Sequence, residues 1–279
     1  MIPEPAATVV GRFVATLDRA LPGVVGGFYV VGSIALGAFR AGRSDIDFVA
    51  TLPRPLSPAE IRALRAVHRR SCADAAVRLI TTPPRTWPLV CNGVFVRPED
   101  LAAPPGLVAP VASQVAGRFD VGSGFDLNPV TWWTLAHRGI AVRGPAPGRL
   151  AVHLDDARLR AWTAANLVAY WRPWADALAR GGPAGWYTRR QQHSTRRAAA
   201  WGVFGVARMH ATIRTGTVIG KEQAGEYALG VFDAGWHPVI RDALAYWRGL
   251  PPVANRSSRA VRTETAAFVS HVVGLVGAR

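Results

Sequence analysis

The sequence predicts an α+β protein, with a mixed β-sheet flanked by helices in its first half and an all-helical bundle in its second. Two observations support this division. Short apolar runs bounded by turn residues, typical of strands, occur before residue 148 and nearly vanish after it. A Gly/Pro-rich stretch, residues 143–148 (Arg-Gly-Pro-Ala-Pro-Gly), separates the two parts. We therefore expect two domains, residues 1–148 and residues 149–279.

Strand signals in the first half are short and clear. Residues 28–31 (Phe-Tyr-Val-Val) form an aromatic and β-branched run bounded by glycines, and this composition favours a strand. Residues 45–51 are expected to form a second strand. Residues 77–81 and 94–96 are further candidates.

Helix signals occur at two places in the same half. Ser57-Pro58-Ala59-Glu60 combines a capping serine, a proline in the first turn and a glutamate three residues after the cap. This pattern predicts a helix that runs to about residue 70. A further helix is expected over residues 129–138, ended by Gly139.

The second half of the sequence is predicted to be helical throughout. The first stretch is expected from Asp155 to the glycines at 181 and 182, with a kink at Pro173. Further helices are predicted over residues 195–214, 221–232, 237–248 and 256–277.

Composition limits the classes of function. The net charge is +15, but Lys221 is the only lysine among the 33 cationic residues, and the arginines are spread along the chain rather than gathered in a tail. We expect attraction for phosphate-bearing ligands in general, with specific nucleic-acid binding as a minority option. The chain has no run of about eighteen apolar residues, no secretion signal at its start and only two cysteines. A cytoplasmic monomer that does not enter membranes is therefore expected.

The informative segment pairs a glycine-serine turn with two aspartates. Asp45 and Asp47 fall two positions apart in a predicted strand, so their side chains point to one face while Ile46 points to the other. Two neighbouring carboxylates repel each other unless a cation lies between them. Mg²⁺ is the natural cation, because it prefers oxygen ligands and is usually shared with substrate phosphates.

Phosphate-binding groups are expected beside this pair. Gly32 and Ser33 directly follow the first strand, where glycine lets the backbone approach a phosphate and a following helix would aim its amides at the anion. The hydroxyls of Ser33 and Ser44 can donate to phosphate oxygens. A strand, Gly-Ser and then Asp-x-Asp in an apolar strand together favour phosphoryl or nucleotidyl transfer, although each piece alone is common.

These residues carry a resemblance to a known family. Residues 29–33 (Tyr-Val-Val-Gly-Ser) and 44–47 (Ser-Asp-Ile-Asp) resemble the DNA-polymerase-β-type nucleotidyltransferase superfamily. Within it, the chain is similar to the aminoglycoside 3''-adenylyltransferases of the streptomycin/spectinomycin type. That narrower resemblance rests on the segments 127–130, 139–145, 206–209, 215–216 and 220–222, and it covers pieces of both predicted domains.

The resemblance implies a role for each matching residue. Asp45 and Asp47 would be the catalytic aspartates and would bind two Mg²⁺ ions. Gly32, Ser33 and Ser44 would contact the phosphates of ATP, the co-substrate. Lys221 would bind the nucleotide phosphates from the second domain, a role for which a compact ammonium is not simply replaced by a guanidinium.

The chain departs from the family at two places. The family takes a third carboxylate, the general base on the acceptor hydroxyl, from a strand downstream of the aspartates. Residues 89–95 contain no acid, and Asn92 stands where one is wanted; an amide cannot take a proton at neutral pH. Glu99 and Asp100 follow, but they are interpreted as a helix start. Residues 189–197 are basic, and Ala198 stands where the family has an acid that faces the cationic drug.

Three hypotheses remain. The leading one is transfer of AMP from ATP to a hydroxyl of a small acceptor, with an aminoglycoside or aminocyclitol antibiotic as the candidate and drug resistance as the implied role. A second is a catalytically degenerate nucleotide-binding protein, which Asn92 motivates. A third is a nucleotidyltransferase that acts on RNA or on a protein partner, which the charge motivates.

Overall fold

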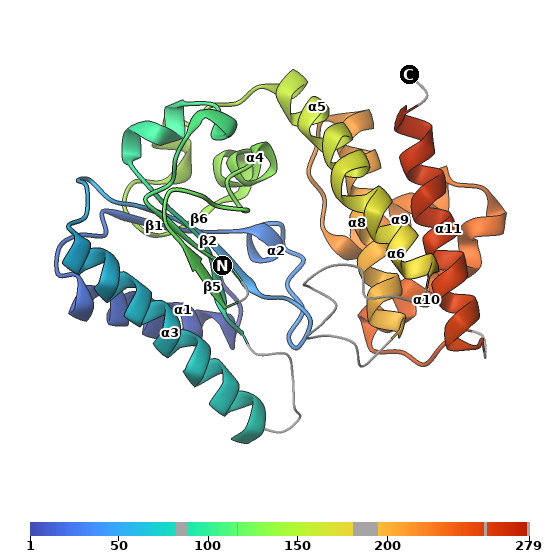
Figure 1. Ribbon diagram of the computed structural model, residues 1–279, viewed down its shortest axis with the longest axis horizontal. Coiled ribbons are helices and arrows are strands. Elements are labelled where there is room, and N and C mark those ends of the chain that lie inside the picture. The colour runs from blue at the N-terminus through green and yellow to red at the C-terminus, as the bar shows by residue number, and fades with distance from the viewer. Residues whose placement is uncertain (82–88, 116, 181–194, 254–255, 278–279) are drawn as a thin grey trace. The chain divides into compact units, whose positions relative to one another are not determined.

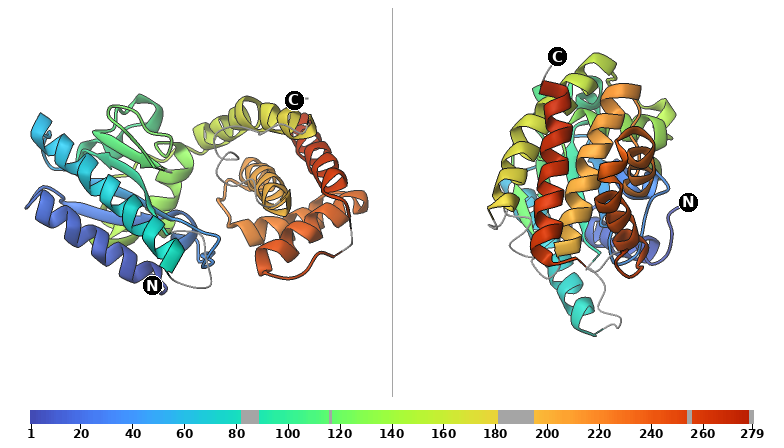
Figure 2. Two further views of the ribbon diagram at one scale, coloured as in Figure 1. Left: turned by 60° about the horizontal axis from the view of Figure 1, so that its bottom comes forward. Right: turned by 90° about the vertical axis from the view of Figure 1, so that its right-hand side faces the viewer.

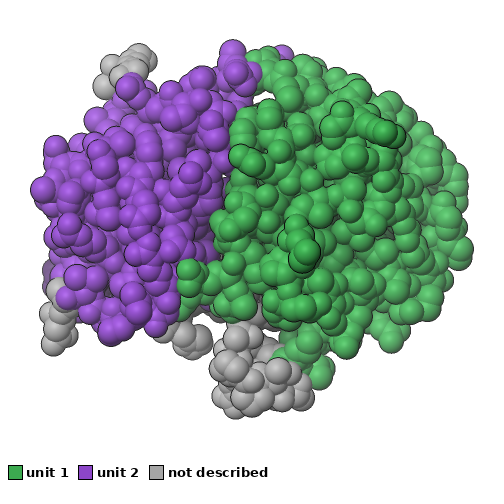
Figure 3. All heavy atoms as spheres, turned by 180° about the vertical axis from the view of Figure 1, so that it is seen from behind, with its two compact units in different colours: residues 1–155 green, residues 156–279 purple. Residues whose placement is uncertain are grey.

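A computed structural model describes residues 1–81, 89–115, 117–180, 195–253 and 256–277 of the protein (Figure 1). The chain divides into two compact units, Met1–Asp155 and Asp156–Arg279, which Figure 3 colours green and purple. The division falls seven residues after the expected boundary at residue 148, and each unit is described separately below.

Unit 1 is built on a six-stranded mixed sheet. Its strands are β1 (Gly27–Val31), β2 (Ile46–Thr51), β3 (Cys91–Val96), β4 (Ala112–Val115), β5 (Arg118–Asp120) and β6 (Ile140–Arg143). The order across the sheet is β5-β4-β3-β2-β1-β6. Only the β2–β3 pair is parallel, and every other neighbouring pair is antiparallel. The expected mixed sheet is confirmed.

One face of this sheet is covered by two long helices, α1 (Ala6–Ala20) and α3 (Pro58–Thr81), which lie side by side in Figure 2. Val9, Val10, Phe13 and Leu17 of α1 recur at helical spacing and are all buried. Phe13 packs against Phe28 and Phe48, with ring centroids 6.0 and 5.5 Å away. These aromatic contacts join β1 and β2 to the helical layer.

The opposite face, here called the α4 face, is covered by α4 (Pro129–Arg138). Trp132 and Leu135 of this helix are buried against Tyr29, Val31, Val49, Val94 and Val96 of the strands. Asn128 caps the helix, its side-chain oxygen accepting hydrogen bonds from the backbone N–H groups of Val130 and Thr131 at 3.0 and 3.1 Å. The single turn α2 (Gly32–Ala35) follows β1 directly and contacts α4.

Three short 3-10 helices connect these elements. They are η1 (Pro98–Ala102), η2 (Pro105–Leu107) and η3 (Pro147–Arg149). In η1, the Asp100 carboxylate accepts a hydrogen bond from the backbone N–H of Arg97 at 2.8 Å. The acidic pair Glu99 and Asp100 is therefore a helix start, as predicted.

Unit 2 is all-helical in its described residues, which confirms the predicted bundle (Figure 2, right). Its elements are α5 (Asp156–Asn166), the π-helical turn η4 (Leu167–Trp171), α6 (Arg172–Ala179), α8 (Thr195–Thr215), α9 (Lys221–Val231), η5 (Ala234–Trp236), α10 (His237–Arg248) and α11 (Ser258–Gly277). Pro173 lies in the first turn of α6, directly after the π turn. Proline has no N–H to donate to the preceding turn of the helix, and the irregular hydrogen bonding of the π turn accommodates this missing bond.

Helix α8 is the centre of this bundle and contacts α5, α9, α10 and α11. Glycines on α8 make room for large rings. A Cβ atom at Gly205 would lie 2.0 Å from the ring of Trp171, and one at Gly202 would lie 2.7 Å from the ring of Trp174. The absence of side chains at these two positions lets both indoles pack directly onto the helix backbone.

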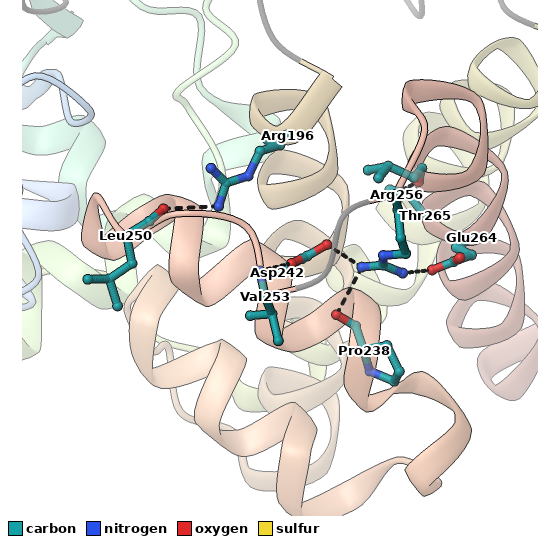
Figure 4. Close-up of polar contacts among 9 residues, drawn as sticks. Arg196, Pro238, Asp242, Leu250, Val253, Arg256, Glu264 and Thr265 are labelled. Carbon is teal, nitrogen blue, oxygen red and sulfur yellow. Dashed lines mark hydrogen bonds and ion pairs between the residues drawn. The ribbon is translucent and has the colours of Figure 1, made fainter.

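A charged cluster joins the middle of α10 to Arg256, in the segment before α11, and to Glu264 of α11 (Figure 4). Asp242 is buried, and its carboxylate accepts hydrogen bonds from the backbone N–H of Val253 at 2.8 Å and from the guanidinium of Arg256. The same guanidinium also pairs with Glu264. Each of these charges has a partner of opposite sign, as buried ions require.

Two differences from the sequence prediction have a physical reason. The strand expected over residues 77–81 is wrong, because α3 continues to Thr81. Neither glycine nor proline occurs between Pro58 and Pro83, so extending the existing helix is easier than nucleating a strand. Helix α1 and the short strands β4, β5 and β6 were not predicted, although the apolar spacing of α1 is visible in the sequence.

None of the helices among the described residues is long and apolar enough to cross a membrane.

Candidate active site at the start of β2

The sheet register places Asp47 on the α4 face. Ile46 and Phe48 point to the opposite face, where they are buried among the residues packed under α1 and α3. Asp47 pairs with Val31 on one side and with Asn92 on the other. Since side chains alternate along a strand, Asp47 stands beside Asn92 on the face that α4 covers.

Asp45 immediately precedes β2, which begins at Ile46, one residue later than the expected start of the strand. The side-chain amide of Asn92 donates a hydrogen bond to Asp45 Oδ2 at 2.8 Å. Asn92 therefore neighbours both aspartates, one through the strand register and the other through its amide. The amide of Asn92 holds the Asp45 side chain in place by donating to it. A carboxylate at position 92 would instead repel Asp45 unless a cation lay between them.

Gly32 lies directly against the carboxylate of Asp47. Its backbone has a φ of +61°, a conformation that favours glycine, and a Cβ atom here would lie 1.8 Å from Asp47 Oδ2. The next residue, Ser33, has a buried hydroxyl without a hydrogen-bond partner among the described residues. Helix α2 is only four residues long, so the helix dipole expected at this point is small. An anion at this turn could instead contact the bare backbone of Gly32 and the Ser33 hydroxyl.

Ser44 has an observed structural contact. It is buried, and its hydroxyl oxygen accepts a hydrogen bond from the backbone N–H of Arg40 at 3.1 Å. The backbone N–H of Ser44 donates back to the Arg40 carbonyl at 2.9 Å. These bonds close the turn that leads into Asp45, so Ser44 positions the first aspartate; its contact with phosphate stays a prediction.

Asp126 is a further buried carboxylate of unit 1 that was not predicted. Burial, and then the charge of Asp45, raise the pKa of Asp126 to about 7. Its Oδ2 atom is out of contact with water and has no hydrogen-bond partner among the described residues. No local pattern marks this residue, because it sits in a loop two positions before the helix cap Asn128, where acids are common.

The residues present fit a divalent cation shared with a phosphate-bearing ligand. In the part of the chain that the structure describes, no three side chains of Asp, Glu, His or Cys are arranged to hold a metal ion by themselves. Mg²⁺ usually takes one or two carboxylates and completes its shell with waters and substrate phosphates. The pair Asp45 and Asp47 suits that kind of site, and the unpartnered Ser33 hydroxyl beside it suits a phosphate oxygen.

Comparisons with known proteins find one matching family model in each half of the chain. Residues 12–77 match the family described as a nucleotidyltransferase domain. Residues 187–274 match the family described as the C-terminal domain of aminoglycoside adenylyltransferase. The chain is an aminoglycoside-adenylyltransferase-like nucleotidyltransferase.

A solved structure has the same fold. The spectinomycin adenyltransferase AAD(9) from Enterococcus faecialis, solved with ATP and spectinomycin, superimposes with a TM-score of 0.62. The likeness covers 96% of this chain and 99% of that one, at 12% sequence identity. No curated protein matches the sequence. The adenylyltransferase-like fold thus extends over nearly the whole chain.

Lys221, which the family resemblance assigns to the nucleotide, begins α9 in unit 2 of this adenylyltransferase-like chain. Its ammonium lies over the ring of Trp247 at 4.9 Å from the centroid and over the ring of Trp201 at 5.5 Å. These aromatic faces stabilise and orient the cation. The other predicted site residues, Gly32, Ser33, Ser44 and the two aspartates, belong to unit 1.

The region that departs from the family is partly described. Residues 189–194 of the basic stretch lie outside the described residues. Arg196 donates a hydrogen bond to the carbonyl of Leu250 at 3.1 Å and lies over the ring of Tyr246, while Ala198 packs against the core of unit 2. The described end of this stretch is therefore tied to the bundle.

Proposed function

We infer that the chain transfers AMP from ATP to a hydroxyl of an aminoglycoside-type acceptor, with Asp45 and Asp47 holding Mg²⁺. The observation that carries the proposal is the placement of the two aspartates around Asn92, with Gly32 directly against the carboxylate of Asp47. The nucleotidyltransferase and aminoglycoside adenylyltransferase domains, and the fold of an enzyme solved with ATP and spectinomycin, support the reaction and both substrates.

Each residue has a part in this reaction. When bound, Mg²⁺ supplies positive charge that offsets the charge of the triphosphate and of the departing pyrophosphate. Asp45 and Asp47 bind the cation, and Asn92 keeps Asp45 oriented toward it. The bare backbone of Gly32 admits the phosphates next to Asp47, and the Ser33 hydroxyl donates a hydrogen bond to one of their oxygens. For Lys221 the family resemblance implies binding to the nucleotide phosphates, and this role stays a proposal.

Two further features belong to the proposal. Neither Cys72 nor Cys91 is in a disulfide, as is usual in a cytoplasmic protein, and we expect the enzyme to act as a cytoplasmic monomer. Gel filtration coupled to light scattering tests the oligomeric state.

A second candidate is a nucleotide-binding protein that does not turn over. The observation that favours it is Asn92, an amide at the β3 position paired with Asp47. In this alternative the protein binds Mg-ATP through Asp45 and Asp47 but releases no pyrophosphate.

One experiment separates these functions. The protein is incubated with Mg-ATP and a panel of aminocyclitols and aminoglycosides, and products are analysed by mass spectrometry. The proposal predicts an acceptor that carries one AMP, formed by the wild type and not by Asp47→Ala. Binding of Mg-ATP without any modified acceptor or released pyrophosphate would instead support the degenerate protein, and failure to bind Mg-ATP would contradict both.

A further inference from the structure

We propose that a groove between α1 and α3 binds a ligand that carries several linked phosphate groups. Neither the sequence motifs nor the comparisons assign a site to this groove, and none of its residues takes part in the proposed AMP transfer. Six polar side chains line it, here called the α1–α3 groove: Arg12 and Thr16 of α1, and Arg70, Ser71, Asp74 and Arg78 of α3.

The α1–α3 groove lies on the face of the sheet opposite to the candidate active site. Helices α1 and α3 run side by side over that face (Figure 2). The apolar lining of the groove, Val9, Phe13 and Val67, belongs to the core that these helices form with the sheet. Asp47 stands on the α4 face instead. A ligand in the groove is therefore distinct from the nucleotide of the transfer reaction.

Three arginines of the groove lack a compensating charge. Among the described residues, the guanidinium groups of Arg12, Arg70 and Arg78 donate no hydrogen bond and form no ion pair. By contrast, Arg54 and Arg143 of the same unit each pair with a carboxylate. Unpaired guanidinium groups around one hollow repel each other and attract an anion.

Ser71 adds a neutral donor to the groove. A serine or threonine within a helix often donates to a carbonyl one turn earlier, as the Thr16 hydroxyl does to the Arg12 carbonyl at 2.8 Å. The Ser71 hydroxyl has no such partner among the described residues. It is therefore available to a ligand, and guanidinium and hydroxyl groups together are donors that suit phosphate oxygens.

Asp74 sets the charge balance of the groove. It is exposed and lies one helical turn from both Arg70 and Arg78, yet it forms no ion pair with a described residue. With Arg12 included, the groove carries three positive charges and one negative charge. A ligand with two or more negative charges offsets this excess, which favours linked phosphates over a single carboxylate.

The length of the groove also favours phosphates in a row. Arg70 and Arg78 are eight residues apart on α3, which is about 12 Å along the helix at about 1.5 Å per residue. A stacked strand of nucleic acid advances about 3.4 Å per nucleotide, so about three to four nucleotides would span the two arginines. Two sources supply this chemistry: single-stranded RNA and a free oligophosphate.

An anionic membrane surface suits the two helices less well. Helices that bind in a membrane interface bury large apolar side chains such as Trp, Phe and Leu. On the described part of α1 and α3, Val77 is the one large apolar side chain that is exposed. The polar donors of the groove therefore favour a dissolved ligand.

The test is the double variant Arg70→Gln with Arg78→Gln. Binding of tripolyphosphate is measured by isothermal titration calorimetry and binding of a labelled oligouridine by fluorescence anisotropy, both in EDTA. We expect the wild type to bind at least one probe, and the variant to bind it about tenfold or more weakly, because two favourable charge contacts are lost. For RNA, the slope of log K against log salt should become shallower by about 1.4, at about 0.7 for each phosphate contact.

Arg62→Gln with Arg69→Gln is the matched control. Both residues are exposed on the same helix but lie outside the groove, so the same loss of charge should change the affinity by about twofold or less. Asp74→Asn removes the negative charge of the groove and should strengthen binding by about threefold. Damage to the fold would not produce such a gain.

The outcomes separate a site from general attraction. Binding of one probe and not the other supports the groove and identifies the source of the phosphates. A wild type that binds neither probe, or equal losses in the two double variants, overturns the inference. Binding to phosphatidylserine vesicles but to neither probe also overturns it, in favour of a membrane surface.

The variant Asp47→Ala distinguishes the groove from the nucleotide site. It should bind both probes like the wild type, because the groove is on the other face of the sheet. Loss of binding in Asp47→Ala would place the probe at the aspartates and overturn the inference. These measurements need no AMP transfer, so their result is separate from that of the proposed function.

Discussion

Asp126 in unit 1 and Asp242 in unit 2 both hold carboxylate oxygens away from water, but their surroundings differ. Both oxygens of Asp242 accept hydrogen bonds, from the backbone of Val253 and from Arg256. Asp126 Oδ2 has no donor among the described residues, and the nearby charge of Asp45 repels it. The first arrangement stabilises the junction of α10 with α11, whereas the second costs stability.

The glycines of the two units differ in the same way. Gly205 in unit 2 leaves space for the indole of Trp171, which is part of the core. Gly32 in unit 1 leaves space for the carboxylate of Asp47. A glycine under an aromatic ring serves packing, whereas we propose that Gly32, under a charged group and next to an unpartnered serine, serves binding.

The largest effect is expected for Gly32→Ala. The new methyl group would lie 1.8 Å from Asp47 Oδ2, so the carboxylate must move by more than about 1 Å, and displacements of that size cost about 100-fold in rate. Pyrophosphate release measures the loss. Gly23→Ala is the matched control: its φ of +69° carries the same backbone strain, but a methyl group there meets no atom within 4 Å. Equal activity in the two variants would contradict the close approach at Gly32.

Asp242→Ala should destabilise unit 2 strongly. It leaves Arg256 with less compensation in a mostly buried setting and removes the acceptor for the N–H of Val253, for which we expect a loss of about 3–5 kcal/mol in the free energy of unfolding. Arg248→Ala removes a more exposed pairing with Glu222 and Glu226 and should cost about 1 kcal/mol or less. Urea denaturation followed by tryptophan fluorescence compares them, and similar losses would show that burial does not decide the difference.

Asp126→Asn should stabilise the metal-free protein, in contrast to Asp242→Ala. Burial raises the pKa of Asp126 in the folded protein to about 7, above the ordinary range of an aspartate, so the folded protein favours the protonated acid. The stability that protonated Asp126 contributes to the folded protein is fully present below about pH 4 and is lost as the pH rises through 7. Asparagine mimics the neutral acid, and the variant should gain about 2–4 kcal/mol over the wild type at pH 8 and almost nothing at pH 4.

The measurement is urea denaturation in EDTA at both pH values. A gain that is equal at pH 4 and pH 8, or a loss at pH 8, would contradict the unpaired state of Asp126.

The smallest pair of effects concerns glycines within helices of unit 2. In Gly205→Ala the methyl group would lie 2.0 Å from the ring of Trp171, and overpacking of this kind costs about 1–3 kcal/mol. Gly230→Ala in α9 meets no atom within 4 Å and should gain about 0.5–1 kcal/mol from better helix propensity. Thermal unfolding should therefore shift in opposite directions, and a shift in the same direction would refute the packing account.

The features that could be predicted from the sequence are those that depend on residues close together along the chain. The glycine-serine turn and the Asp-x-Asp pair were visible because each depends on residues within a few positions of one another. The helices predicted over residues 129–138 and 195–214 are present as α4 and α8, and they could be predicted because capping and breaking residues at their ends mark them in the sequence. The capping box of Ser57 and Glu60 is present as predicted, with Glu60 accepting from the Ser57 N–H at 2.8 Å.

What the sequence did not reveal depends on long-range pairing. In the sequence, most of the strands lie between Asp45 and Asp126. Only the folding of the sheet and of α4 brings Asp126 near enough to Asp45 to be affected by its charge. The short strands β4 and β5 carry few β-branched residues, so their pairing with β3 and not their composition defines them. The donor role of Asn92 likewise became visible only when parallel pairing placed β3 beside β2.

The most direct test of the central claim is the affinity for Mg-ATP, measured by isothermal titration calorimetry on the wild type, Asp45→Ala, Asp47→Ala and the surface control Asp120→Ala. If the aspartates hold the cation that bridges to the triphosphate, either site variant should weaken binding by about 100-fold or more, because the phosphates lose their counter-charge. The control should bind like the wild type. Unchanged affinity in Asp45→Ala and Asp47→Ala would contradict the assignment of this site.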